Sequence, residues 1–422
     1  MAEETFISDD FLRQLTAVGG ADILIGIPTA NNRETVGHVV NAVQIGLVKY
    51  FPRERAVLIN PDAGSKDSTP EAVRSAAVQD FHSFLATAPL RTTHIVTERY
   101  HPNRGPGGAL HLILAAADLL RVKACVLISP NITSITPEWV DALVRPVYRE
   151  GYDFLAPVYE RHKFDGLLVR NILSPLISAV YGRRIDEPAG GEFGLSGALA
   201  CQLLAQDVWH QDFIRQGPAV WMTAAALAGN YRLGQSFLGP KIQIAGNSDQ
   251  NLPDTIQNTV GALFRSFELT EASWISRDGS EAVPMFGFQS ELDLGPVRIN
   301  RKKLSEMFRT GVTELSSILE QILAAPTLKE IQQSAQDGTG GRFADELWVK
   351  TIYEFAISYH RSVMNRDHLL QALTPIYRGR ISSFVLENHG ASAGELRARR
   401  EALLEQYDRL KPYFVQGWSA KA

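Results

Sequence analysis

The feature that most constrains the fold is the alternation of short apolar runs with amphipathic segments between residues 22 and 240. Short apolar runs separated by helix-length segments are typical of parallel strands joined by crossover helices. The segment at 33–51 is one such connection, because its valines and leucine recur at helical spacing. The pattern predicts an α/β fold with helices on both faces of a mostly parallel sheet. The predicted strands are DILIGIP, RAVLIN, THIVT, ACVLIS and DFLAPVY.

Two of the predicted crossover helices begin with the same tripeptide, Thr-Pro-Glu, at 69–71 and at 136–138. A capping hydroxyl, a proline at the first helical position and an acid in the positively charged first turn are all signals of a helix start. We predict a helix from each of them.

Strand signals fade after residue 250, and amphipathic segments dominate the rest of the chain. We therefore expect a sheet domain over 1–250 and a mainly helical domain over 251–422. The pattern of Glu and Arg in the last segment is most simply that of a solvated face. A contact between subunits is the alternative, and with it we expect a homo-oligomer. The predicted helices are RKKLSEMFRTGVTELSSILEQIL, ADELWVKTIYEFAISYH, DHLLQALTPIY and AGELRARREALLEQYDRL.

Composition excludes several classes of protein. A net charge of -4 over 422 residues argues against a nucleic-acid partner, which requires clustered Lys and Arg. Two cysteines supply neither a disulfide framework nor a Cys-based metal site, so a reducing compartment fits best. The acidic start of the chain has no signal-peptide pattern, and no run of about 18 apolar residues occurs. We expect a cytoplasmic protein with no membrane partner.

Polar and small residues follow the first two predicted strands. Pro28, Thr29, Ala30 and Asn31 come after the first strand, and Asp62 follows the second in the stretch NPDAGSKDSTPE. Ligands of parallel sheets bind in the crevice at the carboxyl ends of the strands. An acid there can accept hydrogen bonds from a base or ribose, and a nearby glycine allows close approach. The alternative is that both stretches are Asn- and Asp-rich turns with no ligand.

At this point the residues resemble a known family. IPTANN and NPDAGSKDSTPE are similar to the opening of glycosyltransferase family 2, in which Asp-Asp-Gly-Ser-x-Asp follows the second strand of a GT-A fold. The resemblance continues over residues 20–245 through NRGPGGAL, VLISPNITSITPEW, YERHKFDG, PAGGEFGLSGAL, GPAVWMTAAAL and LGPKIQ. That order is similar to the glucosylglycerate, mannosylglycerate and glucosyl-3-phosphoglycerate synthases. It implies a GT-A fold and retaining transfer of a hexose from a nucleoside diphosphate to a glycerate-type acceptor.

The chain departs from the family at the positions that bind the metal and face the phosphates. The family holds Mg²⁺ or Mn²⁺ with an Asp-x-Asp after the fourth strand and a histidine after a Lys-Ile pair. Here Ser129 and Asn131 stand at the two acidic positions, Gln243 replaces the histidine, and Pro106 replaces a phosphate-facing lysine. Neutral oxygens alone hold these hard cations poorly. We expect no tightly bound metal cofactor.

Two hypotheses follow for a glycosyltransferase-like protein. The first is an active hexosyltransferase that neutralises the diphosphate with cations such as Arg104, Lys163 or Lys241 and with helix N-termini. The second is an inactive relative that binds a nucleotide sugar or serves as a partner subunit. The sequence leaves both open, so activity as an enzyme is undecided.

The resemblance assigns the candidate site residues in three groups. For catalysis we name Glu192 and Arg104, although Arg104 alone also fits a solvated loop. The acceptor group is a cluster of charged side chains suited to a carboxylate or phosphate, with a charged loop as the alternative. The nucleotide group is Pro28, Thr29, Ala30, Asn31, Asp62, Gly105, Gly107, Gly108 and Asn131, and the acceptor group is Arg161, His162, Lys163 and Asp165.

Other enzyme classes fit less well. The stretch GLSGA at 194–198 lacks the second glycine of a hydrolase nucleophile elbow, and the chain has neither a Walker loop nor Gly-x-Gly-x-x-Gly after the first strand. We interpret Trp139, Trp209 and Trp221 as core residues rather than sugar platforms.

Overall fold

The computed structural model describes residues 7–79, 93–243, 252–287, 299–336 and 342–420 of the 422-residue chain. Contacts divide the chain into two units. The sheet unit comprises Met1–Glu160, Gly190–Asp249 and Pro284–Glu291. The helical unit comprises Arg161–Ala189, Gln250–Val283 and Leu292–Ala422.

The chain passes from the sheet unit to the helical unit between residues 249 and 250, which is the domain boundary expected from the sequence. The segment 161–189, which the sequence placed in the first domain, instead belongs to the helical unit. Hydrogen bonds explain why. The indole of Trp348 donates to the Asn171 carbonyl at 2.8 Å, and the buried ammonium of Lys411 donates to the Val180 carbonyl at 2.8 Å.

The strands of the sheet unit are β1 (Ile23–Gly26), β2 (Ala56–Asp62), β3 (His94–Arg99), β4 (Ala124–Leu127), β5 (Phe154–Glu160), β7 (Phe193–Ser196), β8 (Leu233–Pro240) and β10 (Met285–Phe286). Within the described residues they form one eight-stranded sheet in the order β10-β8-β5-β7-β4-β1-β2-β3. Among these described strands, only β7 is antiparallel to its neighbours. The five predicted strands are present, and the predicted mostly parallel sheet is confirmed.

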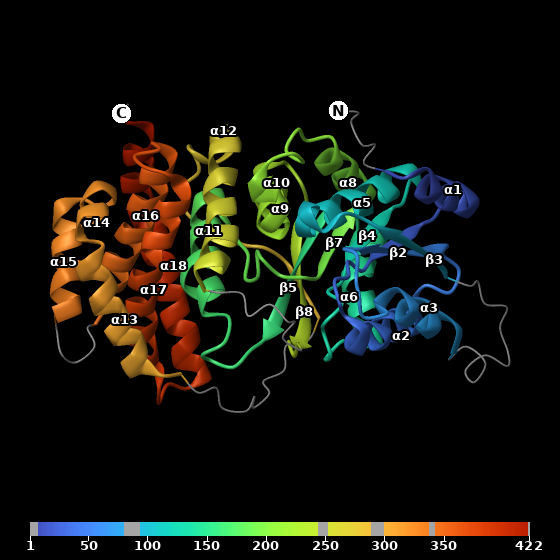
Figure 1. Ribbon diagram of the computed structural model, residues 1–422, viewed down its shortest axis with the longest axis horizontal. Coiled ribbons are helices and arrows are strands. Elements are labelled where there is room, and N and C mark those ends of the chain that lie inside the picture. The colour runs from blue at the N-terminus through green and yellow to red at the C-terminus, as the bar shows by residue number, and fades with distance from the viewer. Residues whose placement is uncertain (1–6, 80–92, 244–251, 288–298, 337–341, 421–422) are drawn as a thin grey trace. The chain divides into compact units, whose positions relative to one another are not determined.

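Helices cover both faces of this sheet, as predicted. The helices of the sheet unit are α1 (Asp9–Val18), α2 (Arg33–Tyr50), α3 (Thr69–Gln79), η1 (Pro102–Arg104), α5 (Gly105–Leu119), α6 (Pro137–Glu150), α8 (Gly197–Leu204), α9 (Asp212–Gln216) and α10 (Pro218–Ala228). Figure 1 shows α2, α3 and α6 on one face, with α5, α8 and α10 on the other. The apolar side chains predicted to cover the sheet from α2 are buried against β1, β2 and β4: Val36, Val39, Val40, Val43 and Leu47.

Both predicted helix starts are present, but their capping chemistry differs from the prediction. Helix α6 begins at Pro137, and the Thr136 side chain makes no cap hydrogen bond. Helix α3 begins at Thr69 itself. Its N–H and its hydroxyl donate to the Asp67 carboxylate at 3.2 and 2.5 Å. The preceding acid therefore supplies the acceptor that the threonine was expected to supply.

The second unit is mainly helical, as the sequence predicts. Its elements are η2 (Val169–Leu173), α7 (Ser174–Tyr181), β6 (Arg183–Arg184), α11 (Leu252–Leu269), α12 (Glu271–Trp274), β9 (Glu281–Ala282), α13 (Arg301–Glu314), α14 (Ser316–Ile322), α15 (Ala325–Gln336), α16 (Asp345–His360), α17 (Arg366–Asn388) and α18 (Ala393–Ser419). The segment predicted as one helix from residue 301 divides at Leu315. Stacked rings form part of the core, with Phe414 against Tyr353 at 4.7 Å and against Trp274 at 5.3 Å.

The charged residues of α18 make contacts inside the helical unit. Arg399 donates to Asn388 Oδ1 at 2.8 Å, and Arg184 donates to Glu401 at 2.8 Å. These contacts fit the solvated-face interpretation, and a homo-oligomer stays a prediction. Among the described residues, no helix combines the length and the apolar character needed to cross a membrane.

Candidate functional site

The carboxyl ends of β1, β2, β4, β5 and β8 lie at one edge of the sheet, because these strands all run in the same direction. Antiparallel β7 starts at that edge, so Glu192, the residue before it, lies there too. Loops at the carboxyl ends of parallel strands form the usual ligand crevice.

The loops after β1 and β2 are joined by buried hydrogen bonds. Thr29 forms an isolated bridge with Asp62, and its hydroxyl donates to the Asp62 carboxylate at 2.9 Å. The Ser65 amide and hydroxyl donate to the same carboxylate at 2.8 and 2.5 Å. Asp62 is only 1% exposed. Its carboxylate therefore braces the two loops, although the sequence suggested a contact with the ligand.

In the loop after β1, Ala30 and Asn31 are exposed and Pro28 is partly buried. Asn31 has a left-handed φ of 56°, and its side-chain oxygen accepts from the Lys66 amide at 2.9 Å. Its own N–H donates to Ser65 Oγ at 2.8 Å. Asn readily adopts this conformation. Of the residues predicted after the first strand, these three present surface to solvent.

The glycines at the start of α5 have a packing role that the sequence did not indicate. A Cβ at Gly105 would collide with the carbonyl oxygen of Arg215, and one at Gly107 would collide with the carbonyl oxygen of Ile214. Gly105 also has a left-handed φ of 56°. These two glycines are therefore required by the approach of α9, and their presence is no separate sign of a phosphate.

A cavity of about 640 Å³ lies beside this glycine-rich turn. Two arginines and three histidines contribute to its wall, and none of the described lining residues is an acid. The His111 ring stacks on Trp209 with centroids 4.3 Å apart. Burial, together with the nearby charge of Arg104, lowers the pKa of His111 to about 4. The lining residues are His101, Asn103, Arg104, Gly107, Gly108, His111, Trp209, His210, Ile214 and Arg215.

Hydrogen bonds join the loops after β4 and β8. Gln243 pairs with Ile132 in an isolated bridge, and its side-chain amide donates to Asn131 Oδ1 at 3.3 Å. The Thr133 amide donates to the Ile242 carbonyl at 2.9 Å, and the Ile242 amide donates to Ser134 Oγ at 3.0 Å. Asn131 and Gln243, far apart in sequence, are thus in contact, but an amide–amide hydrogen bond joins them.

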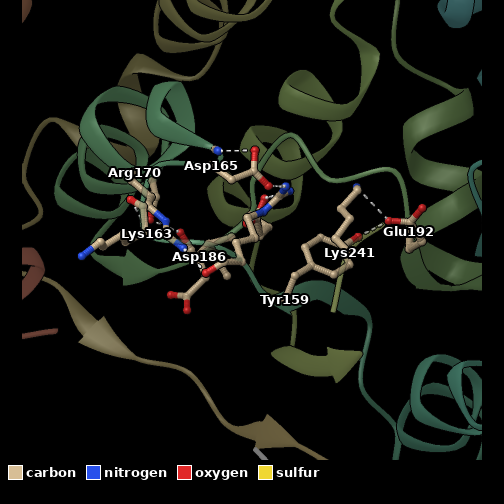
Figure 2. Close-up of polar contacts among 12 residues, drawn as sticks. Tyr159, Lys163, Asp165, Arg170, Asp186, Glu192 and Lys241 are labelled. Carbon is tan, nitrogen blue, oxygen red and sulfur yellow. Dashed lines mark hydrogen bonds and ion pairs between the residues drawn. The ribbon is translucent and has the colours of Figure 1, made fainter. Parts of the chain in front are cut away.

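Glu192 contacts both of these loops, through Ser129 and Lys241, and is fully buried. Its carboxylate accepts from the Lys241 ammonium at 3.2 Å, from the Tyr159 hydroxyl, and from the Ser129 amide at 3.3 Å. Figure 2 shows Tyr159 and Lys241 directed at Glu192. The Lys241 side chain is 6% exposed, and its ammonium lies 4.4 Å from the centre of the Tyr159 ring.

The charge state of Glu192 follows from these partners. Burial by itself raises the pKa of the carboxyl, but the Lys241 ammonium and the Tyr159 hydroxyl outweigh it, so the pKa lies below the usual value. Glu192 is thus an ionised carboxylate in a buried ion pair.

These residues do not fit a tightly bound Mg²⁺ or Mn²⁺. Ser129, Asn131 and Gln243 are neutral, and the neighbouring carboxylate of Glu192 is already paired with an ammonium. Hard divalent cations require carboxylate oxygens for tight binding. No group of three or more His, Cys, Asp or Glu side chains in the described part of the chain has a geometry that could hold a metal.

The residues predicted to bind the acceptor lie in the helical unit. Arg161 is 12% exposed and forms a two-point contact with Glu187 at 2.7 and 3.0 Å. A third contact joins Arg161 to Asp165 at 3.2 Å. The Lys163 ammonium donates to the His389 carbonyl at 2.6 Å. Of the expected basic cluster, Arg161 is therefore paired with two acids, whereas Lys163 is bound by a neutral carbonyl.

Sequence reasoning missed several members of these networks. Tyr159 and Glu187 are 33 and 26 residues from their partners, Glu192 and Arg161. Arg170 is also new; Figure 2 shows it near Lys163, and it donates to the Lys163 carbonyl at 3.3 Å. Burial and then the charge of Arg400 lower the pKa of Arg170. The polar ends of β5 and of the 183–187 segment were the only available signal.

Of the three tryptophans predicted to be core residues, Trp139 and Trp221 are buried. Trp209 is partly buried, and its ring contributes to the cavity wall. The core prediction is therefore confirmed for two of them and only in part for the third.

No family model matches the chain, and a search of curated proteins found no similar sequence. Among solved structures, the chain is similar to glucosyl-3-phosphoglycerate synthase from Mycobacterium tuberculosis in complex with Mn²⁺, UDP-glucose and phosphoglyceric acid. The identity is 18% and the TM-score 0.42, over 61% of this chain and 83% of that chain. A further structure of the M. tuberculosis synthase is 20% identical, with a TM-score of 0.42 over 61% and 84% of the two chains. A structure described only as a mycobacterial protein is 19% identical, with a TM-score of 0.43 over 61% and 78%.

Proposed function

We propose that this chain is a glycosyltransferase-like protein that binds a nucleoside diphosphate or its sugar without a divalent metal. In its active form, it transfers the hexose to a glycerate-type acceptor. The observation that carries the proposal is the closure of four loops at one sheet edge: Thr29 on Asp62, and Asn131 on Gln243. The ordered motifs between residues 20 and 245 supply the reaction class.

The exposed backbone and side chains around Ala30 and Asn31 are suited to the base and ribose. Asp62 keeps that surface in place from beneath. For the diphosphate we assign Arg104, because it lies at the start of the 15-residue helix α5 and on the wall of a cavity whose described lining residues include no acid. A guanidinium and a helix N-terminus both favour a phosphate.

In the transfer, the bond between the anomeric carbon and the diphosphate oxygen breaks, and its electron pair leaves with the diphosphate. The acceptor hydroxyl bonds to the anomeric carbon and loses its proton. Positive groups beside the departing oxygens lower the barrier to this step. Because both Glu192 oxygens are engaged in buried contacts, we assign that residue to positioning, in place of the catalytic role expected from the sequence.

An acceptor carboxylate at Arg161 has to replace one of the acids already bound there. Asp165 is the better candidate for exchange, because it is 48% exposed and accepts one hydrogen bond from Arg161, whereas Glu187 is 8% exposed and accepts two from Arg161. We propose that the acceptor takes the place of Asp165.

A second candidate is a binding protein without transferase activity. The specific observation in its favour is that Glu192 and Arg161, one in each unit, are both occupied by internal ion pairs. These two ion pairs are equally consistent with a protein that binds a nucleotide and has no transferase activity.

The test is a thermal-shift panel of UDP and GDP in EDTA, followed by product analysis with their glucose and mannose derivatives and D-glycerate or 3-phosphoglycerate. A ligand that binds the native state raises Tm by mass action. Stabilisation with product supports the transferase, and stabilisation without product supports the binding protein. No stabilisation by any nucleotide contradicts both.

Arg104→Gln is the matched site variant, and Arg53→Gln, at an exposed position before β2, is its control. Loss of one charge-assisted hydrogen bond costs about 1.5–3 kcal/mol, so we expect UDP to bind roughly 10- to 100-fold more weakly to Arg104→Gln. The control should bind UDP as the wild type does. Equal loss in both variants would point to a general effect of net charge.

A further inference from the structure

We propose that Arg215 is a second diphosphate-binding residue, which acts together with Arg104 on the wall of the cavity beside the glycine-rich turn. The inference rests on the proposed function and adds a residue to its diphosphate subsite. Arg215 lies in α9, far from Arg104 in the chain, so no local pattern in the sequence connects the two.

The packing of α9 against α5 brings Arg215 to this turn. A Cβ at Gly105 would lie 3.3 Å from Cγ of Arg215, so the arginine side chain begins directly beside the residue that follows Arg104. A Cβ at Gly107 would lie 3.1 Å from Cα of Arg215. Ile214, the preceding residue of α9, is 1% exposed. The position of Arg215 is therefore fixed by packing against the two glycines.

Arg104 and Arg215 both line the cavity of about 640 Å³, and none of its described lining residues is an acid. His111 of the same lining is neutral at pH 7, because its pKa is lowered to about 4. Both phosphates of a diphosphate carry negative charge, and the neutral side chains after β4 and β8 do not fit a tightly bound metal that could offset it. Two guanidiniums in one cavity supply positive charge and paired hydrogen bonds to both phosphates.

The acid that now holds Arg215 is one that a phosphate can displace. The Arg215 guanidinium donates to the Asp212 carboxylate at 2.5 Å, and the two side chains are 44% and 91% exposed. An exposed ion pair of this kind contributes little to stability. Arg215 can therefore exchange Asp212 for a bound phosphate without disturbing the fold.

The test measures the binding of UDP, uridine and inorganic pyrophosphate by calorimetry in EDTA. Arg215→Gln should bind UDP and pyrophosphate about 10-fold more weakly than the wild type, because a charge-assisted hydrogen-bonding group is lost. Uridine binding should not change, because uridine carries no phosphate. The matched control is Arg13→Gln, which removes an exposed arginine that pairs in the same i,i+3 geometry with Asp10 on α1.

A second variant tests the exchange of partners. Asp212→Asn frees Arg215, so it should tighten pyrophosphate binding by up to about fivefold. The gain should disappear when Arg215→Gln is also present, and a gain that persists there would contradict the exchange. Asp10→Asn, which removes the acid from the matched pair on α1, is the control for the loss of one negative charge.

Unchanged binding of UDP and pyrophosphate by Arg215→Gln overturns the inference. An equal loss of uridine binding also overturns it, because that result would mean that the substitution disturbs α9. If the wild type binds pyrophosphate through Arg215 but binds no UDP, the anion site stands and the proposed function fails. If the wild type binds UDP and Arg215→Gln binds it equally well, only the inference fails. Binding of neither ligand by the wild type contradicts both.

Discussion

The buried pair of Glu192 and Lys241 allows a quantitative prediction from three variants: Glu192→Gln, Lys241→Met and the double substitution. The pair is 0% and 6% exposed with 3.2 Å between its charged atoms. Removing one partner of such a pair leaves an uncompensated buried charge and costs about 3–5 kcal/mol, whereas replacing both is often close to neutral. The single variants should each be destabilised by that amount. The double variant should be more stable than either of them.

The penalty in Lys241→Met should also depend on pH. In the wild type the pKa of Glu192 is lowered, so its contribution to stability is complete above its usual pKa of 4.5 and is lost only as pH falls below that value. Without the ammonium, burial is opposed only by the hydrogen bonds from Tyr159 and Ser129, so the pKa of Glu192 should be higher than in the wild type. The carboxyl then takes up a proton as pH falls, and the difference in stability from wild type should shrink by up to about 1.4 kcal/mol per pH unit.

Urea denaturation at pH 7 and pH 5, followed by circular dichroism, measures both effects. Two results would refute the reasoning. One is a double variant whose loss equals the sum of the single losses, since that would mean that the two side chains do not interact. The other is a Lys241→Met penalty that stays constant or grows as the solution is acidified.

Three further predictions concern other parts of the sheet unit. Gly105→Ala should lower the free energy of unfolding by roughly 2–4 kcal/mol, because the added Cβ would collide with the Arg215 carbonyl and the residue has a left-handed φ. Gly37→Ala is the control: its Cβ would lie in open space on α2, so it should raise the free energy of unfolding by about 0.5–1 kcal/mol in the same denaturation assay. His111→Phe should flatten the loss of Tm between pH 6.5 and pH 4, because the lowered pKa of His111, about 4, makes the native state take up its proton later than the unfolded chain; an unchanged pH profile would contradict this. Ser129→Asp with Asn131→Asp and Gln243→His should make UDP binding depend on Mn²⁺, as calorimetry would show; metal-independent binding by that variant would count against the assignment of these positions.

The convergence of the ligand loops was predictable because it follows from strand direction. Parallel strands place the residues after them at one edge, so the proximity of the loops after β1 and β2 was expected, although the hydrogen bond from Thr29 to Asp62 was not. The proximity of Asn131 and Gln243 was implied by the resemblance, because both stand at metal-binding positions of the family. Buried valines at helical spacing likewise predicted α2.

What sequence reasoning missed are contacts that depend on tertiary packing. Nothing in the local pattern indicates that Glu192 pairs with Lys241, 49 residues later, or that Glu187 holds Arg161. The glycines at the start of α5 resembled a phosphate loop, yet the approach of α9 explains Gly105 and Gly107. Antiparallel β7 also lacked a signal, because strand direction is set by the path of the whole chain.

The most direct test of the account is calorimetric titration of wild-type protein with UDP, once in EDTA and once in Mn²⁺. Ser129, Asn131 and Gln243 offer no carboxylate to a metal, so we predict binding with the same Kd in both solutions. Binding that appears only in the presence of Mn²⁺ would contradict the claim that this sheet edge holds a diphosphate without a metal.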